Sequence, residues 1–138
     1  MSELQQHAIQ RALDGYANEL REGLPKEVLS VVQGNVNAGS WTDQVSVAGY
    51  VSCIPTGKQN DESIDAILSV EREGERLSFV AAVYESSGRL LASVVAEPLM
   101  STDAEHVEAD VRRLAPQAIE PLKLAFVRQL LLRANQGA

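Results

Sequence analysis

The sequence predicts an α+β fold with four parts in chain order: an N-terminal helix, a short second helix, a four-stranded antiparallel β-meander and a long kinked C-terminal helix. Three observations lead to this prediction. Four central segments alternate apolar and polar residues, short glycine-containing connections separate most of them, and both flanking regions carry apolar residues at helical spacing. The chain has 138 residues, which is the size of one domain, so we expect a single α+β domain over residues 1–138.

The four strands are expected at residues 44–54, 63–72, 76–84 and 89–97. Period-two alternation is typical of strands, and short connections require antiparallel neighbours. Gly74 and Gly88 occupy hairpin positions where the backbone needs a positive φ. The side chains expected to face the core are Val45, Val47, Val51, Cys53, Ile64, Ala66, Leu68, Val70, Leu77, Phe79, Ala81, Val83, Leu90, Ala92, Val94 and Ala96.

Residues 4–24 predict one amphipathic helix, because their apolar side chains recur at steps of three and four. Ser2 and Gln5 have the spacing of a capping box at its start. Gly23 and Pro25 are expected to end it.

A shorter second helix is expected over residues 25–32, with a strand as the alternative, followed by a loop over 34–40. Thr102 and Glu105 predict a second capping box at the start of the C-terminal helix. Pro116 cannot donate a backbone hydrogen bond, so we expect a break or kink just before it.

Charge and hydropathy exclude several classes of function. The net charge is −7 and the isoelectric point about 4.8. Direct binding to nucleic acid or to anionic lipid requires a basic face, so neither is expected. No apolar run reaches the ~18 residues of a membrane span. One cysteine allows no internal disulfide, and the N-terminus lacks the pattern of a secretory signal, so we expect a cytoplasmic protein.

Few residues could carry enzyme chemistry. His106 has Asp103 and Asp110 at helical spacing, which could bring three metal ligands together, but an acidic first turn explains the same pattern. Cys53 alternates with apolar residues and is expected to be a buried thiol. No serine-nucleophile motif is present. We therefore assign no catalytic residue, metal or cofactor, and expect a non-enzymatic protein.

The second face of the predicted sheet is unusually apolar. A half-exposed antiparallel sheet should be polar on its outer side. Apolar or aromatic residues nevertheless occupy this side at Ala48, Tyr50, Ile67, Val80, Ala82, Tyr84, Leu91 and Val95. A homodimer is the simplest cover, a different protein is the alternative, and the chain's own second helix could also fold over this face.

These patterns lead to the hypothesis of a small acidic protein-binding module. In size, acidity and α+β composition the chain is similar to small prokaryotic inhibitors, immunity proteins and secretion chaperones, although no motif identifies a family. The acidic loops permit a partner with a basic surface. Trp41 is either a binding residue or a cap on the edge of the core. The partner-binding candidates are Trp41, Tyr50, Ile67, Val80, Tyr84, Leu91, Asp61, Glu62 and Glu73.

A second hypothesis is a small-ligand-binding domain or an enzyme with a cavity between sheet and helices. Small residues on the inner face could leave such a cavity, or could instead let the helices pack closely. The residues concerned are Ala66, Ala81, Ala92 and Ala96.

Overall fold

A five-stranded antiparallel sheet packs against helices from both ends of the chain. The computed structural model describes residues 1–59 and 62–136; for 33–35 and 135–136 it describes the backbone alone. The elements in chain order are α1 (Glu3–Leu13), α2 (Tyr16–Glu22), α3 (Lys26–Leu29), β1 (Val32–Thr42), β2 (Ser46–Pro55), β3 (Ile64–Glu73), β4 (Arg76–Glu85), β5 (Leu90–Pro98) and α4 (Ala104–Gln136). The α+β class, the antiparallel meander and the long C-terminal helix are confirmed.

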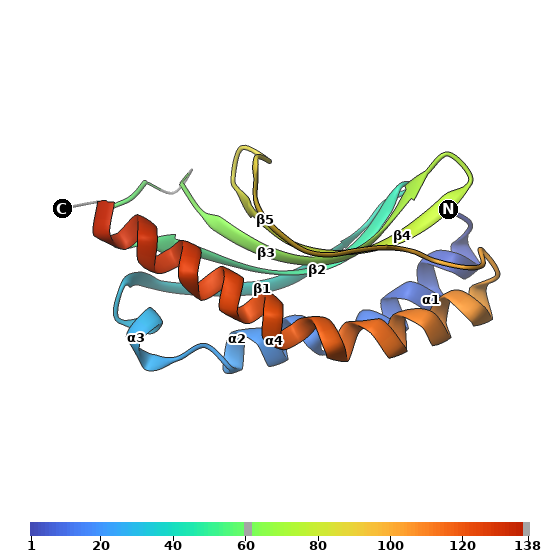
Figure 1. Cartoon of the computed structure of the whole chain (residues 1–138), viewed down its shortest axis with the longest axis horizontal. Helices are drawn as coiled ribbons and strands as arrows, with labels where there is room; N and C mark the ends of the chain where they lie inside the picture. Colours follow the sequence, from blue (N-terminus) through green and yellow to red (C-terminus); the bar gives the residue numbers. More distant parts are fainter. Residues whose placement is uncertain (60–61, 137–138) are drawn as a thin grey trace.

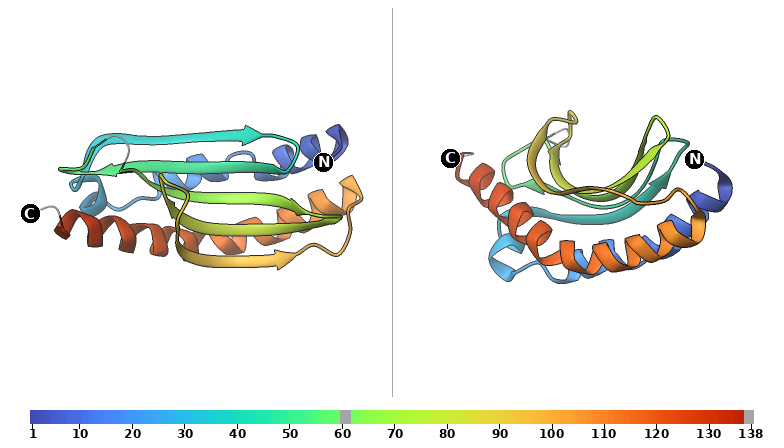
Figure 2. Two further views of the ribbon diagram at one scale, coloured as in Figure 1. Left: turned by 90° about the horizontal axis from the view of Figure 1, so that it is seen from above. Right: turned by 45° about the vertical axis from the view of Figure 1, so that its right-hand side comes forward.

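The sheet is strongly curved, and its two faces have different surroundings. Its strands lie in the order β1-β2-β3-β4-β5. The helices of the described residues lie along the convex face, where α1 and α4 run side by side (Figures 1 and 2). The opposite, concave face is open in both views of Figure 2. The two ends of the chain therefore supply the cover for one face of its central sheet.

The hydrophobic core fills the space between the convex face and the helices. Its largest fully buried side chains include Phe79 from β4, Leu68 from β3, and Phe126 and Leu122 from α4. Burying one such side chain stabilises the fold by roughly 1.5–3 kcal/mol, so this layer supplies most of the driving force for folding. Cys53 lies in the same core, as expected for a buried thiol.

Strand β1 is the main error of the sequence prediction. The expected second helix is reduced to the four residues of α3, and the expected loop over 34–40 is part of an eleven-residue strand. Glycine and asparagine have low strand propensity, so the pattern was misread as a loop. Pairing with β2 overrides that local preference, with regular register from Val36 to Thr42.

The N-terminal helix is divided in two rather than continuous. Asp14 adopts an extended backbone and Gly15 has φ +88°, so the chain turns between α1 and α2. Glycine tolerates this conformation without a steric penalty. The capping box of Ser2 and Gln5 is confirmed: the backbone N–H of Gln5 donates to Ser2 Oγ and that of Ser2 donates to Gln5 Oε1.

Helix α4 differs from the prediction at its start, and the expected break or kink takes the form of a bend without a break. Asp103 replaces Thr102 as the capping side chain, since its Oδ1 accepts from the backbone N–H of Glu105 at 2.9 Å. The helix continues through Pro116 and Pro121, both of which are exposed, and its axis bends along the sheet (Figure 1). Packing of the buried residues on either side compensates for the missing backbone donors.

The four predicted strands are confirmed as β2 to β5, with local corrections. Gly74 and Gly88 have positive φ in their hairpins. Val45 was expected in the core, but it precedes β2 and is 50% exposed. Its backbone N–H and that of Ser46 donate to Asp43 Oδ1, which forms a tight turn and holds the pKa of Asp43 below its ordinary value.

Two bulges in β5 change which face its residues occupy. The register is irregular opposite Ala81/Ala82 and opposite Val83/Tyr84. An extra residue at each bulge reverses the alternation that follows. Val95 therefore pairs with Ala81 on the helix side, while Leu90 and Ala96 pair with Tyr84 and Val80 on the concave side. The sequence prediction had each of these three residues on the opposite face.

Candidate functional site

The concave face of the sheet is the candidate site. Directly paired residues of antiparallel strands point to the same side, so the register assigns each residue to a face. The central part of the concave face consists of Asn37, Gly39 and Trp41 from β1; Ser46, Ala48, Tyr50 and Ser52 from β2; Asp65, Ile67, Ser69 and Glu71 from β3; Ser78, Val80, Ala82 and Tyr84 from β4; and Leu90, Ser93 and Ala96 from β5. The register also places Glu73, Arg76 and Pro98 on this side, at one end of the sheet.

Large side chains converge over small ones at the centre of this face. Ala48, Ser69 and Ala82 are only 1–2% exposed, although the helices lie on the other side of the sheet. Their larger neighbours on the concave face, including Tyr50 and Ile67, are half-buried. The curvature of the strands brings these side chains together, so the face is a filled surface rather than a hollow.

An aromatic pair lies at the β1–β2 side of the concave face. The ring centroids of Trp41 and Tyr50 are 5.7 Å apart with an interplanar angle of 36°. The indole N–H of Trp41 donates to Ser46 Oγ at 2.9 Å. A Cβ atom at Gly39 would lie 2.5 Å from the hydroxyl oxygen of Tyr50 and 2.7 Å from its Cζ. Because Gly39 has no side chain, the Tyr50 ring can approach the backbone of β1 closely at this position.

Two carboxylates lie within the face. Ser69 Oγ donates to Glu71 Oε1 at 3.3 Å. The Oδ1 atom of Asp65 is buried and has no hydrogen-bond partner among the described residues. An unsatisfied buried acceptor costs about 1–3 kcal/mol of folding free energy. The orphaned oxygen lies beside Tyr84, which is the β4 partner of Asp65.

Electrostatics also reflect the curvature of the sheet. Burial raises the pKa of Tyr84, and the negative charge of Glu71 adds to that shift. By register the two residues are three cross-strand rows apart, which corresponds to roughly 20 Å on a flat sheet at ~3.3 Å per residue. The strong curvature of the sheet shortens that separation (Figure 2).

Five of the sequence-predicted site residues lie together on this face: Trp41, Tyr50, Ile67, Val80 and Tyr84.

The other predicted residues do not join them. Leu91 lies in the second bulge of β5 and packs against the core cluster. Glu62 lies before the start of β3. Glu73 pairs with Arg76 and therefore points to the concave side, but it lies at the hairpin end of β3, so the expected acidic residues are divided between opposite ends of the sheet. Asp61 lies outside the described residues. The alternative that the second helix covers the concave face is also wrong, because α2 and α3 lie along the convex face with the other helices.

Sequence reasoning missed the polar part of the face. Its five serines and Asp65 alternate with core residues, a pattern that is typical of ordinary solvated surface. The signal was present: each of these residues is two positions from an apolar residue of this face on the same strand or pairs with one across the sheet. The missed residues are Ser46, Ser52, Ser69, Ser78, Ser93 and Asp65.

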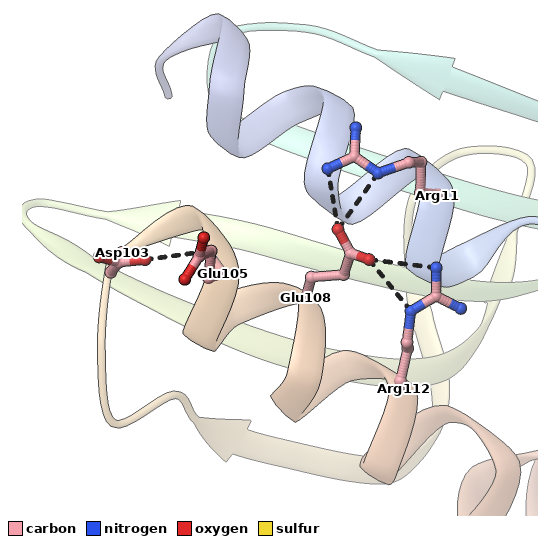
Figure 3. A network of polar contacts seen from close by, with 5 residues as sticks. All are labelled: Arg11, Asp103, Glu105, Glu108 and Arg112. Carbon is pink, nitrogen blue, oxygen red and sulfur yellow. Dashed lines mark hydrogen bonds and ion pairs between the residues drawn. The ribbon is translucent and has the colours of Figure 1, made fainter.

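The acidic start of α4 has structural partners. Glu108 accepts hydrogen bonds from Arg11 of α1 and from Arg112, which holds the pKa of Glu108 below its ordinary value (Figure 3). His106 Nδ1 is 3.7 Å from Asp103 Oδ1, and Asp110 pairs with Arg113.

The described residues give little support for a metal site, a reactive thiol or a membrane-spanning helix. They contain no group of three or more His, Cys, Asp or Glu placed to hold a metal ion. Burial, together with the charge of Asp65, raises the pKa of Cys53 to about 12, which disfavours a thiolate nucleophile. No helix in this part of the chain is long and apolar enough to cross a membrane.

One polar hollow lies at the end of the sheet where β2 meets β3 and β4 meets β5. It has a volume of about 480 Å³ and is lined by both arginines that bind Glu85, namely Arg89 and Arg133. These contacts hold the pKa of Glu85 low and neutralise much of the local positive charge. The hollow is thus a mixed-charge cleft rather than an anion site.

Comparison with known proteins adds no functional information: no family model, curated protein or solved structure matches this chain.

Proposed function

We propose that this protein is a small acidic, non-enzymatic binding module that receives a protein partner on the concave face of its sheet. The observation that carries the proposal is the composition of that open face. Trp41, Tyr50, Ile67, Val80 and Tyr84 are grouped there without a helix over them. Apolar side chains grouped on an uncovered surface often mark an interaction site.

The mixture of residues favours a protein partner over a small ligand. Tyrosine and tryptophan supply large, stiff contact areas with a polar tip, and serine adds adaptable hydrogen bonds, as in binding loops that recognise proteins. The face spans five strands, about 19 Å across at ~4.8 Å spacing, which suits a polypeptide surface.

The small-ligand alternative has weaker support. Its premise was a cavity lined by inner-face alanines, but Ala66 and Ala81 are fully buried in the core and Ala96 lies on the concave face. Two alanines of α4, Ala115 and Ala118, are also fully buried. Small residues on both sides of this interface favour close packing of α4 on the sheet.

Affinity capture with matched variants tests the proposal. Wild-type protein should retain a partner from extract of the source cells, and Val80→Asp should lose it because the charge lies in the middle of the concave face. Leu124→Asp is the control, since Leu124 is an exposed apolar residue on α4. Titration with the identified partner should reproduce the order of affinities. Equal binding by Val80→Asp and wild type, or loss in Leu124→Asp alone, would place the partner site elsewhere.

A further inference from the structure

The two edges of the sheet are protected to different extents. Strand β1 has the sequence Val-Gln-Gly-Asn-Val-Asn-Ala-Gly-Ser-Trp-Thr, without a charged residue or a proline. From Val36 to Thr42 it pairs with β2 in seven consecutive registered steps. Because β1 has a sheet neighbour on one side only, alternate backbone N–H and C=O groups of this regular stretch point away from the sheet.

Strand β5, at the other edge, carries the usual protection against pairing. Two bulges interrupt its register, and Glu97 and Pro98 lie at its end. Bulges, charges and prolines are the devices by which natural sheets prevent edge-to-edge association. Strand β1 has a register irregularity between Val32 and Val36, but its stretch from Val36 to Thr42 has no bulge, charge or proline. This difference from β5 indicates that Val36 to Thr42 is an edge kept available for another strand.

The surface beside β1 is also incomplete. Val36 and Ala38 on the helix side of the strand, and Ala17 of α2, pack against the core but remain partly exposed. A hollow of about 280 Å³ lies along the same edge, lined in part by Leu13, Ala17, Ala38 and Trp41. A strand added to β1 would extend the sheet over this region and bury these apolar groups.

We propose that β1 pairs antiparallel with β1 of a second copy of this chain, forming a two-fold dimer with a continuous ten-stranded sheet. Two-fold pairing places β1 against β1 of the other copy, so any charge on the strand would lie close to a like charge and repel it. An uncharged strand such as β1 is therefore suited to pairing with a second copy of itself. The chain has a net charge of −7, yet this edge strand contributes no charge to the seam. The dimer would join the two concave faces side by side, with both Trp41–Tyr50 pairs flanking the seam.

This dimer is independent of the proposed partner site, because it uses the sheet edge rather than the concave face. It also differs from association through the concave faces themselves. Two concave surfaces facing each other would meet at their rims and leave their centres apart, so they are poorly suited to a close interface. The homodimer expected from sequence thus has better support at the β1 edge.

Sedimentation of two matched double-lysine variants tests the dimer. Asn37→Lys/Ser40→Lys places charges on exposed residues of β1, one on each face of the sheet; Ser93→Lys/Ala96→Lys places the same charge on exposed residues of β5. Wild type and the β5 variant should sediment as dimers, while the β1 variant should sediment as a monomer. Circular dichroism should show that the β1 variant is folded. A monomeric wild type at submillimolar concentration, a dimeric β1 variant, or dissociation of both variants would overturn the proposal.

Hydrogen exchange of the unmodified protein gives a test that does not depend on how the variants fold. Amides of β1 that point away from the sheet should become protected as the protein concentration rises, because a dimer forms by mass action. Amides of β5 should exchange at the same rate at all concentrations. Concentration-independent exchange of β1 would contradict the dimer, as would protection that appears on β5 instead.

Discussion

The two faces of one sheet differ in what their residues do. On the convex face, aliphatic residues and Phe79 are fully buried under α1, α2 and α4. On the concave face, the same strands present tyrosines, serines and half-buried aliphatic residues with no helix above them. Alternation along β2, β3 and β4 separates the two sets. The comparison teaches that one face stabilises the fold while the other remains available for contact.

Truncation on the covered face should have the largest effect. Phe79→Ala removes a fully buried ring from the core between β4 and the helices. We expect the free energy of unfolding to fall by about 3–5 kcal/mol, the usual cost of deleting a buried aromatic side chain. Urea denaturation monitored by circular dichroism measures it. A loss below about 1 kcal/mol would mean that the convex face is not the centre of the core.

A charge on the open face should cost less. Val80→Asp lies one residue along β4 from Phe79 but points to the concave side, where its carboxylate can reach water. We expect a loss of about 2 kcal/mol, from reduced apolar contact and repulsion by the nearby Glu71. The same denaturation experiment gives the value. If Val80→Asp destabilises the protein as much as Phe79→Ala, the concave face belongs to the core.

Crowding at the aromatic pair should have a smaller effect. Gly39→Ala would place a methyl group against the Tyr50 ring, which must then move away from Trp41. Because Tyr50 is half-exposed and can rotate, we expect a cost of about 1 kcal/mol and a changed Trp41 fluorescence. In the Tyr50→Ala background the same substitution should cost nearly nothing. Additive effects of the two substitutions would rule out the contact between them.

The smallest effect should come from the ion-pair network outside both faces. Arg11 and Arg112 lower the pKa of Glu108, so this carboxylate stabilises the folded state above the ordinary glutamate pKa of about 4.3. The stabilisation disappears as the pH falls through the lower folded-state pKa. Glu108→Gln should therefore be less stable than wild type at neutral pH and equal to it in strong acid. A difference in unfolding free energy that does not change with pH would contradict this account.

Local signals in the sequence predicted much of this architecture. Period-two alternation located β2 to β5, and the glycines of the hairpins and the Ser2–Gln5 capping box were predicted from local chemistry alone. Such features depend on interactions between residues close in sequence, where propensity and spacing are informative. The class of the fold could therefore be derived without knowledge of tertiary contacts.

The missed features depend on distant contacts. In the sequence Gly39 is typical of a loop, and only the structure shows the Tyr50 ring close to it. Strand β1 forms because it pairs with β2, which its own residues do not predict. The bulges that exchange the faces of Val95 and Ala96 leave no local mark in a strand of small apolar residues. The composition of the concave face was only half predicted for the same reason, because its serines become part of a site through their neighbours on other strands.

Oxidative footprinting of the three tyrosines tests the central claim most directly. Tyr50 and Tyr84 lie on the concave face, Tyr16 lies in α2 on the helix side, and all three are partly exposed. In the free protein all three should be labelled. In the complex with the captured partner, labelling of Tyr50 and Tyr84 should fall sharply while that of Tyr16 stays unchanged. Protection of Tyr16 with continued labelling of Tyr50 and Tyr84 would show that the partner binds the helices instead.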